Sequence, residues 1–391
     1  MYFFIFIHTA TNQTPFWSNF EFHSSFLPNS MPEMSAPAVQ DQITSIQLNF
    51  QKFQEIMQSA QDNYKKYYDK GRKKNPAFKV GEKSTYKGEV TTIFFLGFQN
   101  HEVISLLLFP FFLIIYCMTI CGNLLIIALV SYSKVLHSPM YFFLSQLSIS
   151  DIILSTDISP NMLNIVLHEG TSISLSGCMT QYYFFGFSEA SECFLLMVMS
   201  YDRYLAICSP LHYAYIMSPA LCIKLVLVSW LFSCIVALIL TLSMCQLQFC
   251  GPNTIDHFLC DFDPLVELSC SDVSSMQMEV TVLSIPVLVV PFLVIVVSYT
   301  CIVLAILKIS SSSGRAKTFS TCSSHLTVVS IFYGTLITMY MIPKRGQSRI
   351  ISKILALLYT VFTPFLNPFI YSLRNNDIKK ALRNVLYNKR V

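Results

Sequence analysis

The chain has 391 residues, of which 53% are hydrophobic and only 12% are Asp, Glu, Lys or Arg, and its formal net charge is +4. Soluble domains carry about 25% charged residues, so this composition excludes an ordinary water-soluble protein and indicates lipid as the main solvent. The first 90 residues contain none of the 13 cysteines and few long apolar runs. We therefore divide the chain into an N-terminal extension, residues 1–90, and a membrane domain, residues 91–391.

The N-terminal extension divides again at about residue 40. Residues 1–40 mix Pro, Ser, Asn and Phe, and this mixture predicts no packed structure. From Asp41 to Asp69 the apolar residues recur at spacings of three and four, which predicts an amphipathic helix, and the basic run KKYYDKGRKK overlaps its end. The extension is therefore predicted to be largely disordered with one helical segment.

Residues 41–88, which include the segments AQDNYKKYYDKGRKK and FKVGEK, resemble the end of the integrase region of retroelement polyproteins. The pattern departs from that family at Ser84 and Thr85, where an apolar strand would follow. One interpretation of the basic run is nucleic-acid binding; the other is a solvated, inert helix. We favour a fused or mis-spliced exon, and we expect no nucleic acid among the partners.

Seven apolar stretches follow, each long enough for a helix that crosses a bilayer, which needs about 20 residues. Backbone amides in lipid must bond internally, so helices are the expected form. Isolated acids interrupt the second stretch, at Asp151 and Asp157, and the third, at Glu189 and Glu192. The stretches are Glu102–Lys134, Met140–Leu163, Cys178–Cys208, Leu225–Ile255, Val280–Leu307, Thr318–Pro343 and Ile354–Leu373. The predicted fold is an all-α membrane protein, a bundle of seven transmembrane helices.

Basic residues predict the orientation, because they concentrate in cytoplasmic loops. With the start of the bundle outside, the inner loops and the tail hold most of the Lys and Arg, and the outer loops hold most of the acids. The loop with Lys344, Arg345, Arg349 and Lys353 is the exception. The tail NNDIKKALRNVLYNKR predicts an amphipathic helix on the inner leaflet.

Five motifs occur in order along the membrane domain. They are GNLLI (Gly122–Ile126), PMYFFLSQLSISD (Pro139–Asp151), MSYDRYLAIC (Met199–Cys208), KTFSTCSSHL (Lys317–Leu326) and PFLNPFIYSLRN (Pro364–Asn375). Together they resemble the rhodopsin-like G-protein-coupled receptors and, within them, the olfactory receptors. The resemblance implies a multi-pass plasma-membrane protein with its N-terminus outside. It would bind a small, mostly apolar odorant and activate a stimulatory G protein that raises cAMP.

Other classes of protein are weighed against this one. A G-protein-coupled receptor for a non-odorant small ligand is the nearest alternative, and a membrane-tethered nucleic-acid-binding fusion is the more distant one. An enzyme is not expected, because Ser323 and His325 are close in sequence but have no evident third partner for a catalytic set.

The resemblance implies a switch at the inner ends of the third and seventh helices. Arg203 would be held by the adjacent Asp202 at rest and would meet the G protein on activation. In the seventh helix Pro368 removes one backbone hydrogen bond, which gives either a static kink or, as the resemblance implies, a hinge that moves Tyr371 inward on activation. The switch residues are Asp202, Arg203, Tyr204, Asn367, Pro368 and Tyr371.

Asp151 and Glu192 are acids within predicted spans, and two explanations stand. Burial can keep isolated carboxyls protonated. Alternatively, the pair binds a sodium ion, which the resemblance supports, with Asn123 and Asn367 as polar neighbours. Apart from this structural sodium, no cofactor is expected.

Five cysteines lie near the outer face, where an oxidising environment permits disulfides. They are Cys178, Cys245, Cys250, Cys260 and Cys270, and spacing alone leaves their pairing open. The olfactory resemblance implies the pairs Cys178–Cys260 and Cys250–Cys270. A zinc site is disfavoured because a Cys-x-x-Cys spacing is missing.

A ligand is expected among the outer halves of the third, fifth and sixth helices, where residues three and four apart share a face. This lining is apolar and aromatic, and Glu189 is its one strongly polar group, able to accept a hydrogen bond from an alcohol or amine. The expected ligand-binding residues are Tyr182, Phe185, Gly186, Glu189, Leu283, Val287, Tyr333, Leu336, Ile337 and Tyr340.

Overall fold

The structure is a computed structural model, and it describes residues 90–98, 102–250, 253–308, 311–341 and 349–387. Contacts divide the chain into two compact units, Met1–Ser84 and Thr85–Val391. All described residues belong to the second unit. The predicted helix Asp41–Asp69 and the retroelement-like segment therefore lie outside the described residues.

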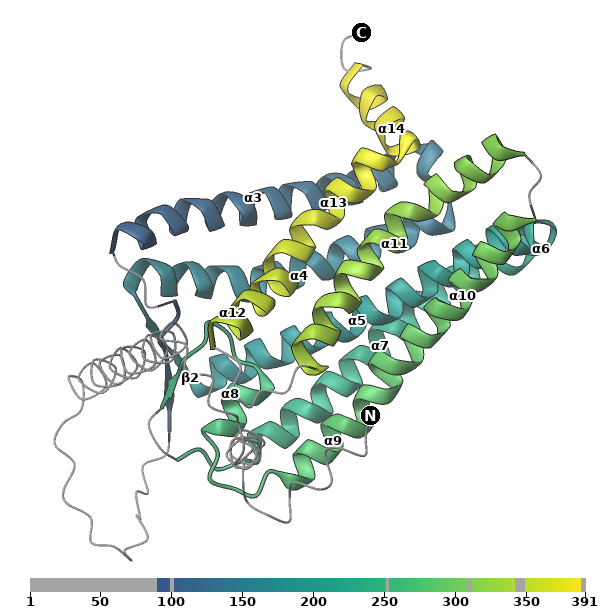
Figure 1. The fold of residues 1–391 in the computed structure, drawn as a ribbon. Helices are drawn as coiled ribbons and strands as arrows, with labels where there is room; N and C mark the ends of the chain where they lie inside the picture. The colour runs from purple at the N-terminus through teal and green to yellow at the C-terminus, as the bar shows by residue number, and fades with distance from the viewer. Residues whose placement is uncertain (1–89, 99–101, 251–252, 309–310, 342–348, 388–391) are drawn as a thin grey trace, which may run out of the picture. The chain divides into compact units, whose positions relative to one another are not determined.

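Seven long helical segments run side by side through the described part of the second unit (Figure 1). The first four are single helices: α3 (Glu102–Tyr132), α4 (Pro139–His168), α5 (Leu175–Cys208) and α7 (Pro219–Cys245). The fifth joins α9 (Ser274–Ser284), a wide-turn segment η3 (Ile285–Val289) and α10 (Val290–Leu307). The sixth is α11 (Ser312–Met341), and the seventh joins α12 (Arg349–Leu357), the wide-turn η4 (Leu358–Phe362) and α13 (Thr363–Arg374). The predicted all-α bundle is confirmed.

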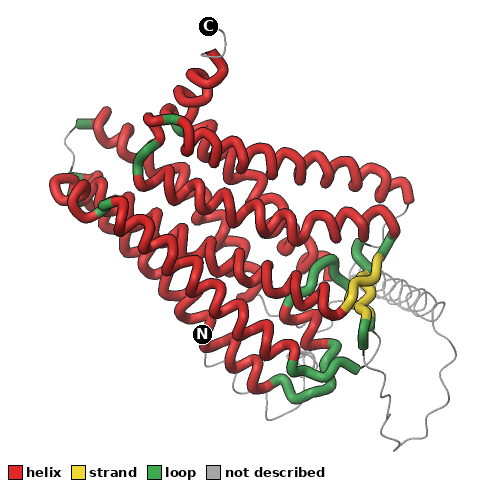
Figure 2. Tube along the Cα trace, turned by 180° about the vertical axis from the view of Figure 1, so that it is seen from behind, coloured by secondary structure: helices red, strands yellow, loops and turns green. Residues whose placement is uncertain are grey.

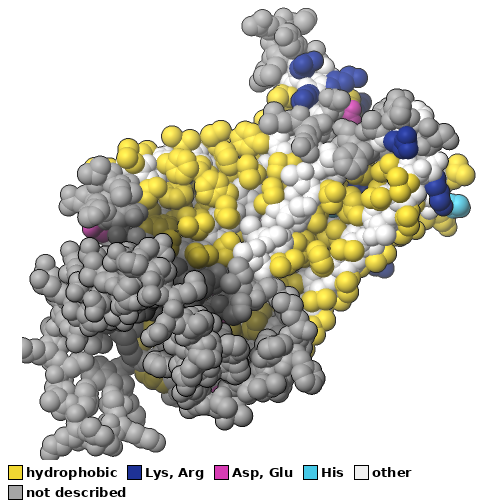
Figure 3. All heavy atoms as spheres, in the orientation of Figure 1, with side chains coloured by type: hydrophobic (Ala, Val, Ile, Leu, Met, Phe, Trp, Pro, Cys, Tyr) yellow, Lys and Arg dark blue, Asp and Glu magenta, His cyan; other side chains and the backbone are white. Residues whose placement is uncertain are grey.

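The surface of this bundle suits a bilayer. In the described part of the chain, four segments are long and apolar enough to cross: Ser105–Tyr132, Pro219–Cys245, Ser274–Leu307 and Ile350–Ser372. Large apolar side chains such as Leu106, Leu231 and Val297 are more than 60% exposed. Apolar side chains cover the flank in Figure 3, while Lys and Arg gather near α14. The helices α4 and α5 are more polar because their acids and serines point into the bundle, where Asp151 and Glu192 are buried.

The observed helices differ from the predicted stretches mainly at their ends. The fourth was predicted to run to Ile255, but α7 stops at Cys245, and the apolar residues after it enter the following loop. In the fifth segment the wide turns coincide with Pro286 and Pro291, whose missing N–H groups interrupt the regular hydrogen-bond ladder.

A small sheet closes one end of the bundle, which we call the sheet end. Strand β1 (Thr92–Phe95) pairs antiparallel with β2 (Thr171–Ser174) and parallel with β3 (Thr254–Ile255). The strands lie together in Figure 2, and the short helix α8 (Phe262–Glu267) belongs to the same region of the chain as β3. The sequence did not predict this sheet, because strands of two to four residues carry too little alternation to be recognised.

The opposite end, which we call the α14 end, carries η2 (Lys134–Leu136), α6 (Pro210–Ile216) and the terminal helix α14 (Asn376–Tyr387). Ile378 and Ala381 of α14 are buried while Lys379 and Lys380 are exposed, so the predicted amphipathic helix is confirmed. The hydroxyl of Tyr141 anchors its start, donating to Asn375 Oδ1 and Asp377 Oδ2 at 3.0 Å each.

Candidate functional site

At the α14 end, the acid Asp202 is held by a residue that the sequence reasoning missed. The hydroxyl of Tyr213, in α6, donates to Asp202 Oδ1 at 2.8 Å, and Asp202 is 1% exposed. Burial, and then the nearby Asp202 carboxylate, raise the pKa of Tyr213 above its ordinary value. Arg203 is within electrostatic range of Asp202 although no ion pair between them is recorded in the described part, so Tyr213 adds a hydrogen bond to the predicted pair.

Arg203 lies beside a cluster of aromatic polar side chains from three other segments. It is within electrostatic range of Tyr299, His325 and Tyr371. The hydroxyl of Tyr299 meets His325 Nδ1 at 2.6 Å, which joins α10 to α11. Arg203 Nε and the hydroxyl of the 2% exposed Tyr371 are buried without a hydrogen-bond partner in the described part of the chain. Unpaired buried polar groups are costly, so any rearrangement that pairs them would stabilise this cluster.

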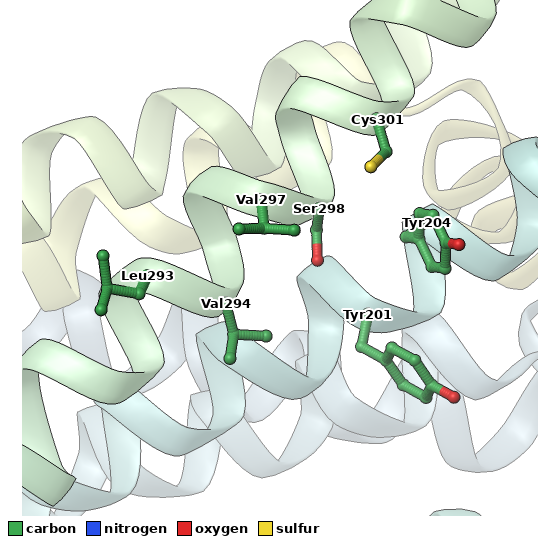
Figure 4. Close-up of a pocket in the computed structure, with 7 residues that line it drawn as sticks. All are labelled: Tyr201, Tyr204, Leu293, Val294, Val297, Ser298 and Cys301. Atoms are coloured by element: carbon green, nitrogen blue, oxygen red, sulfur yellow. The ribbon is translucent and has the colours of Figure 1, made fainter.

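Tyr204, the third residue of the motif, lies apart from this cluster. Its ring stacks on Tyr201 at 6.4 Å, and both line a shallow groove of about 400 Å³ between α5 and α10 (Figure 4). Tyr201 is 37% exposed and Val297 is 61% exposed. The groove therefore belongs to the lipid-facing surface, not to the interior of the bundle.

The bend in the seventh segment is compensated by the first. Pro368 cannot donate to the carbonyl four residues earlier, that of Pro364. Asn123 Nδ2 donates to this carbonyl at 3.2 Å and to Thr119 O at 3.1 Å. A Cβ at Gly122 would lie 3.1 Å from Pro368 Cβ, so glycine permits the close approach of α3 and α13. The polar compensation expected around Pro368 is present, and Asn123 supplies it.

The buried acids lie at the centre of the bundle. Asn367 Nδ2 donates to both carboxylate oxygens of Asp151 at 3.1 Å, and both residues are at most 3% exposed. Glu192, 1% exposed, interacts electrostatically with Asp151, and its Oε1 has no hydrogen-bond partner in the described part. Asn123 Oδ1 is also unpaired. Two carboxylates with unpaired buried oxygens nearby fit a small hard cation, which prefers oxygen ligands.

Most of the expected ligand-binding residues gather between α5, η3 and α11. The buried members are Tyr182, Phe185, Val287, Tyr333 and Leu336, and the partly exposed members are Leu283, Gly186 and Glu189. A row of aromatic rings in contact crosses the site. Phe185 packs edge-on against Tyr359, Tyr359 against Phe332, and Phe332 against Tyr333. Tyr359 of η4 was not predicted, since a single Tyr in an apolar span gives no sequence signal.

Two expected ligand-binding residues do not join this group. Ile337 is 46% exposed and lines a groove of about 630 Å³ on the surface between α10 and α11. Its neighbour Leu336 is buried because successive helical residues are about 100° apart. The side chain of Tyr340 lies outside the described residues.

Two disulfides hold the loop after α7 over the sheet end. The structure joins Cys178 to Cys260 and Cys250 to Cys270, the pairing that the family resemblance implied, and Cys245 is free and exposed. Gln181 reinforces the first link, since its Oε1 accepts from Cys260 N at 2.9 Å. The loop is therefore fixed to α5 by a covalent bond and a main-chain hydrogen bond.

The contacts of Lys353 explain part of the exception to the expected distribution of basic residues among the loops. Its Nζ lies 2.5 Å from Asp256 Oδ1 and 2.6 Å from Gly97 O, and the side chain is buried. Asp256 follows β3, and Gly97 follows β1. One cation thus joins the seventh segment to two strands of the sheet end, and its charge is neutralised locally.

Known proteins show the class to which this arrangement belongs. The bundle has the fold of squid rhodopsin, whose crystal structure aligns with a TM-score of 0.56 at 18% identity, covering 74% of this chain and 87% of that one. The olfactory receptor family model matches residues 112–389.

Individual relatives agree with the family match. Human olfactory receptor 11L1 is 50% identical over 300 residues, which cover 77% of this chain and 93% of the relative. Rat olfactory receptor 1468 is 48% identical over 283 residues, 72% of this chain and 90% of the relative. The chain therefore belongs to the olfactory receptor family of G-protein-coupled receptors. These proteins are membrane receptors and not enzymes.

Proposed function

We propose that this chain is an odorant receptor of the plasma membrane, with the sheet end outside and the α14 end facing the cytoplasm. It binds a small, mostly apolar volatile ligand and activates a stimulatory G protein, which raises cAMP. The charge distribution supports the orientation, because Lys and Arg gather near α14. The observation that carries the signalling role is the half-buried Arg203, whose buried Nε is unpaired and lies near the unpaired hydroxyl of Tyr371.

The mechanism follows from which contacts can change. Ligand bound among Tyr182, Phe185, Leu336 and their neighbours shifts the packing of α11 against α5. Because His325 is on α11, a displacement of α11 breaks its hydrogen bond to Tyr299. Tyr299 then becomes free to pair with Arg203, as the unpaired Tyr371 already is, and the opened end admits the G protein. The ligand needs only a higher affinity for the second arrangement than for the first.

A sodium ion between Asp151 and Glu192 would act as a modulator of the resting arrangement. Its ligands would be carboxylate oxygens of α4 and α5, with Asn123 and Asn367 as neutral neighbours. The unpaired Oε1 of Glu192 supports this proposal. The ion supplies positive charge that allows both acids to stay ionised within the bundle.

The test is a cAMP assay in cells that express the receptor, with an odorant panel as the ligand source. Arg203→Ala should reach the cell surface at the wild-type level and give no cAMP response. Lys224→Ala is the matched control, because it removes an exposed base at the same end and should leave signalling intact. Normal signalling by Arg203→Ala would refute the role given to Arg203.

A further inference from the structure

Glu189 points toward the interior of the bundle from the middle of α5. It follows the exposed Thr180 by nine residues, which is two and a half turns of an α-helix, so the two side chains project from opposite faces. Two further acids are close to this part of α5: Asp151 interacts electrostatically with Glu192, and Asp261, which precedes α8, interacts electrostatically with Tyr182. The carboxylate of Glu189 therefore lies inside the expected ligand region.

The space beside Glu189 is not filled. Its side chain stays partly exposed although it faces inward. One turn earlier, a Cβ built at Gly186 would meet no atom within 4 Å. Gly186 and Glu189 are three residues apart and lie on adjoining parts of one helix surface. An inward residue with exposed area, beside a glycine with open space, lines a hollow.

The charges around this hollow are all of one sign. Asp261 interacts electrostatically with Glu189, and Glu189 interacts electrostatically with Glu192 and Tyr182. Among the described residues, no Lys or Arg pairs with Glu189, and Lys353 of the same half of the bundle is bound to Asp256. A carboxylate that faces the inside of the bundle without a counter-charge is costly, so the hollow favours a positively charged occupant.

A second, independent feature points to a ligand in the same place. Tyr333 is 5% exposed, and its hydroxyl has the Cys193 thiol, a weak hydrogen-bonding group, as its side-chain partner. It lies against Cys193, which is one turn after Glu189 and within its electrostatic range. Two polar groups that face one hollow from α5 and α11 can therefore bind a single polar head, with aromatic rings as its walls.

We propose that the preferred ligands are small protonated organic amines, whose ammonium group binds Glu189 and whose hydrocarbon part packs against Phe185 and Leu336. The Tyr333 oxygen accepts a second N–H, and the tyrosine rings favour a cation over their faces. This inference rests on the proposed odorant-receptor function and specifies its ligand class. A neutral alcohol of the same shape would leave the acid without a counter-charge.

The experiment measures cAMP responses to matched compounds: hexylamine, cyclohexylamine and benzylamine, each with its alcohol of the same carbon skeleton. The wild type should respond to the amines at concentrations at least about tenfold lower. Glu189→Gln should raise the amine half-maximal concentrations roughly 10- to 150-fold, the effect of losing one charged hydrogen bond, and should leave the alcohol values within about threefold. Glu189→Asp, which keeps the charge, should keep the amine preference.

Glu267→Gln is the control, since it removes an exposed acid at the sheet end and should change neither series. An alcohol preference in the wild type, or unchanged amine potency in Glu189→Gln, would overturn the amine class. Silence toward all six compounds, with basal cAMP above that of Arg203→Ala, would also overturn it and leave the odorant-receptor function standing. Basal cAMP no higher than that of Arg203→Ala would count against the proposed function itself.

Discussion

The two ends of the bundle are held together by different kinds of interaction. The sheet end has two disulfides, three paired strands and the buried Lys353–Asp256 ion pair. The polar contacts described at the α14 end are side-chain hydrogen bonds, such as Tyr213 to Asp202, Tyr299 to His325, and Tyr141 to the start of α14. A disulfide is worth about 2–4 kcal/mol, and a single side-chain hydrogen bond about 1–2 kcal/mol. One end is therefore built to keep its shape, and the other can exchange partners at low cost.

The largest effect should come from breaking the covalent link at the sheet end. Cys178→Ser removes a bridge between residues 82 apart in sequence, for which the loop-entropy relation gives a loss of about 4.5 kcal/mol. Surface expression should fall sharply, as measured by flow cytometry of an epitope-tagged receptor. The free, exposed Cys245 offers the control Cys245→Ser, which should express normally. Equal expression of the two variants would mean that the sheet end is not held by this bridge.

Breaking the ion pair at the same end should have the next largest effect. Lys353→Met leaves Asp256 without its cation and Gly97 O without its donor, at a cost of about 2–3 kcal/mol. The midpoint of thermal unfolding in detergent should fall. The double variant Lys353→Met with Asp256→Asn should recover part of the loss, because it removes the stranded charge. A double variant less stable than the single one would contradict the proposed pairing.

At the α14 end, single changes should alter signalling more than folding. Tyr213→Phe removes the hydrogen bond to Asp202, about 1–2 kcal/mol, and should raise basal cAMP while surface expression stays within about twofold. Tyr215, which is 88% exposed on the same short helix, provides the control Tyr215→Phe. If basal cAMP is unchanged and expression collapses, the bond is structural, and the contrast between the two ends fails.

The buried acids between the two ends allow a test of the proposed sodium site. Asp151→Asn keeps the shape of the side chain but removes one of two acids, and it should abolish the sodium dependence of the agonist response. The measurement compares half-maximal concentrations in sodium and in choline buffers, and Ser155→Ala on the same helix serves as the control. Sodium dependence that persists in Asp151→Asn would favour the protonated-acid explanation.

The smallest effect is expected at Asp272, on the exposed rim of the sheet end. Its Oδ1 accepts from Ser274 N at 3.0 Å and from Ser274 Oγ at 2.6 Å, and these bonds lower the pKa of the carboxyl. A lowered folded-state pKa means that the stabilisation is present above the unfolded value of about 3.9 and is lost as the pH falls through the folded value. Asp272→Ala should speed amide exchange in the first turn of α9 at neutral pH. Below the folded pKa the variant and the wild type should exchange alike.

The sequence was most informative where one interaction type repeats over many residues. Long apolar runs predicted the helices, and the five motifs predicted the family that the relatives confirm. The sequence was less informative where single residues decide. Ile337 was assigned to the ligand region by its spacing, yet it is 46% exposed on the bundle surface, because a small error in helix rotation moves a side chain from one face to another. The origin of residues 1–90 and the boundary after residue 90 stay predictions.

By itself, the sequence determined the solvent and the class of this protein, because hydrophobicity and helix periodicity are properties of each segment and need no partner. Only the tertiary structure decided which polar atoms meet. Three contacts join residues whose separation along the chain gives no sign that they meet. They are Asn123 with the carbonyl that Pro368 leaves unpaired, Tyr213 with Asp202, and Lys353 with Asp256 and Gly97. Most buried polar groups are satisfied by whatever the packing brings within about 3 Å, and packing is a property of the whole bundle.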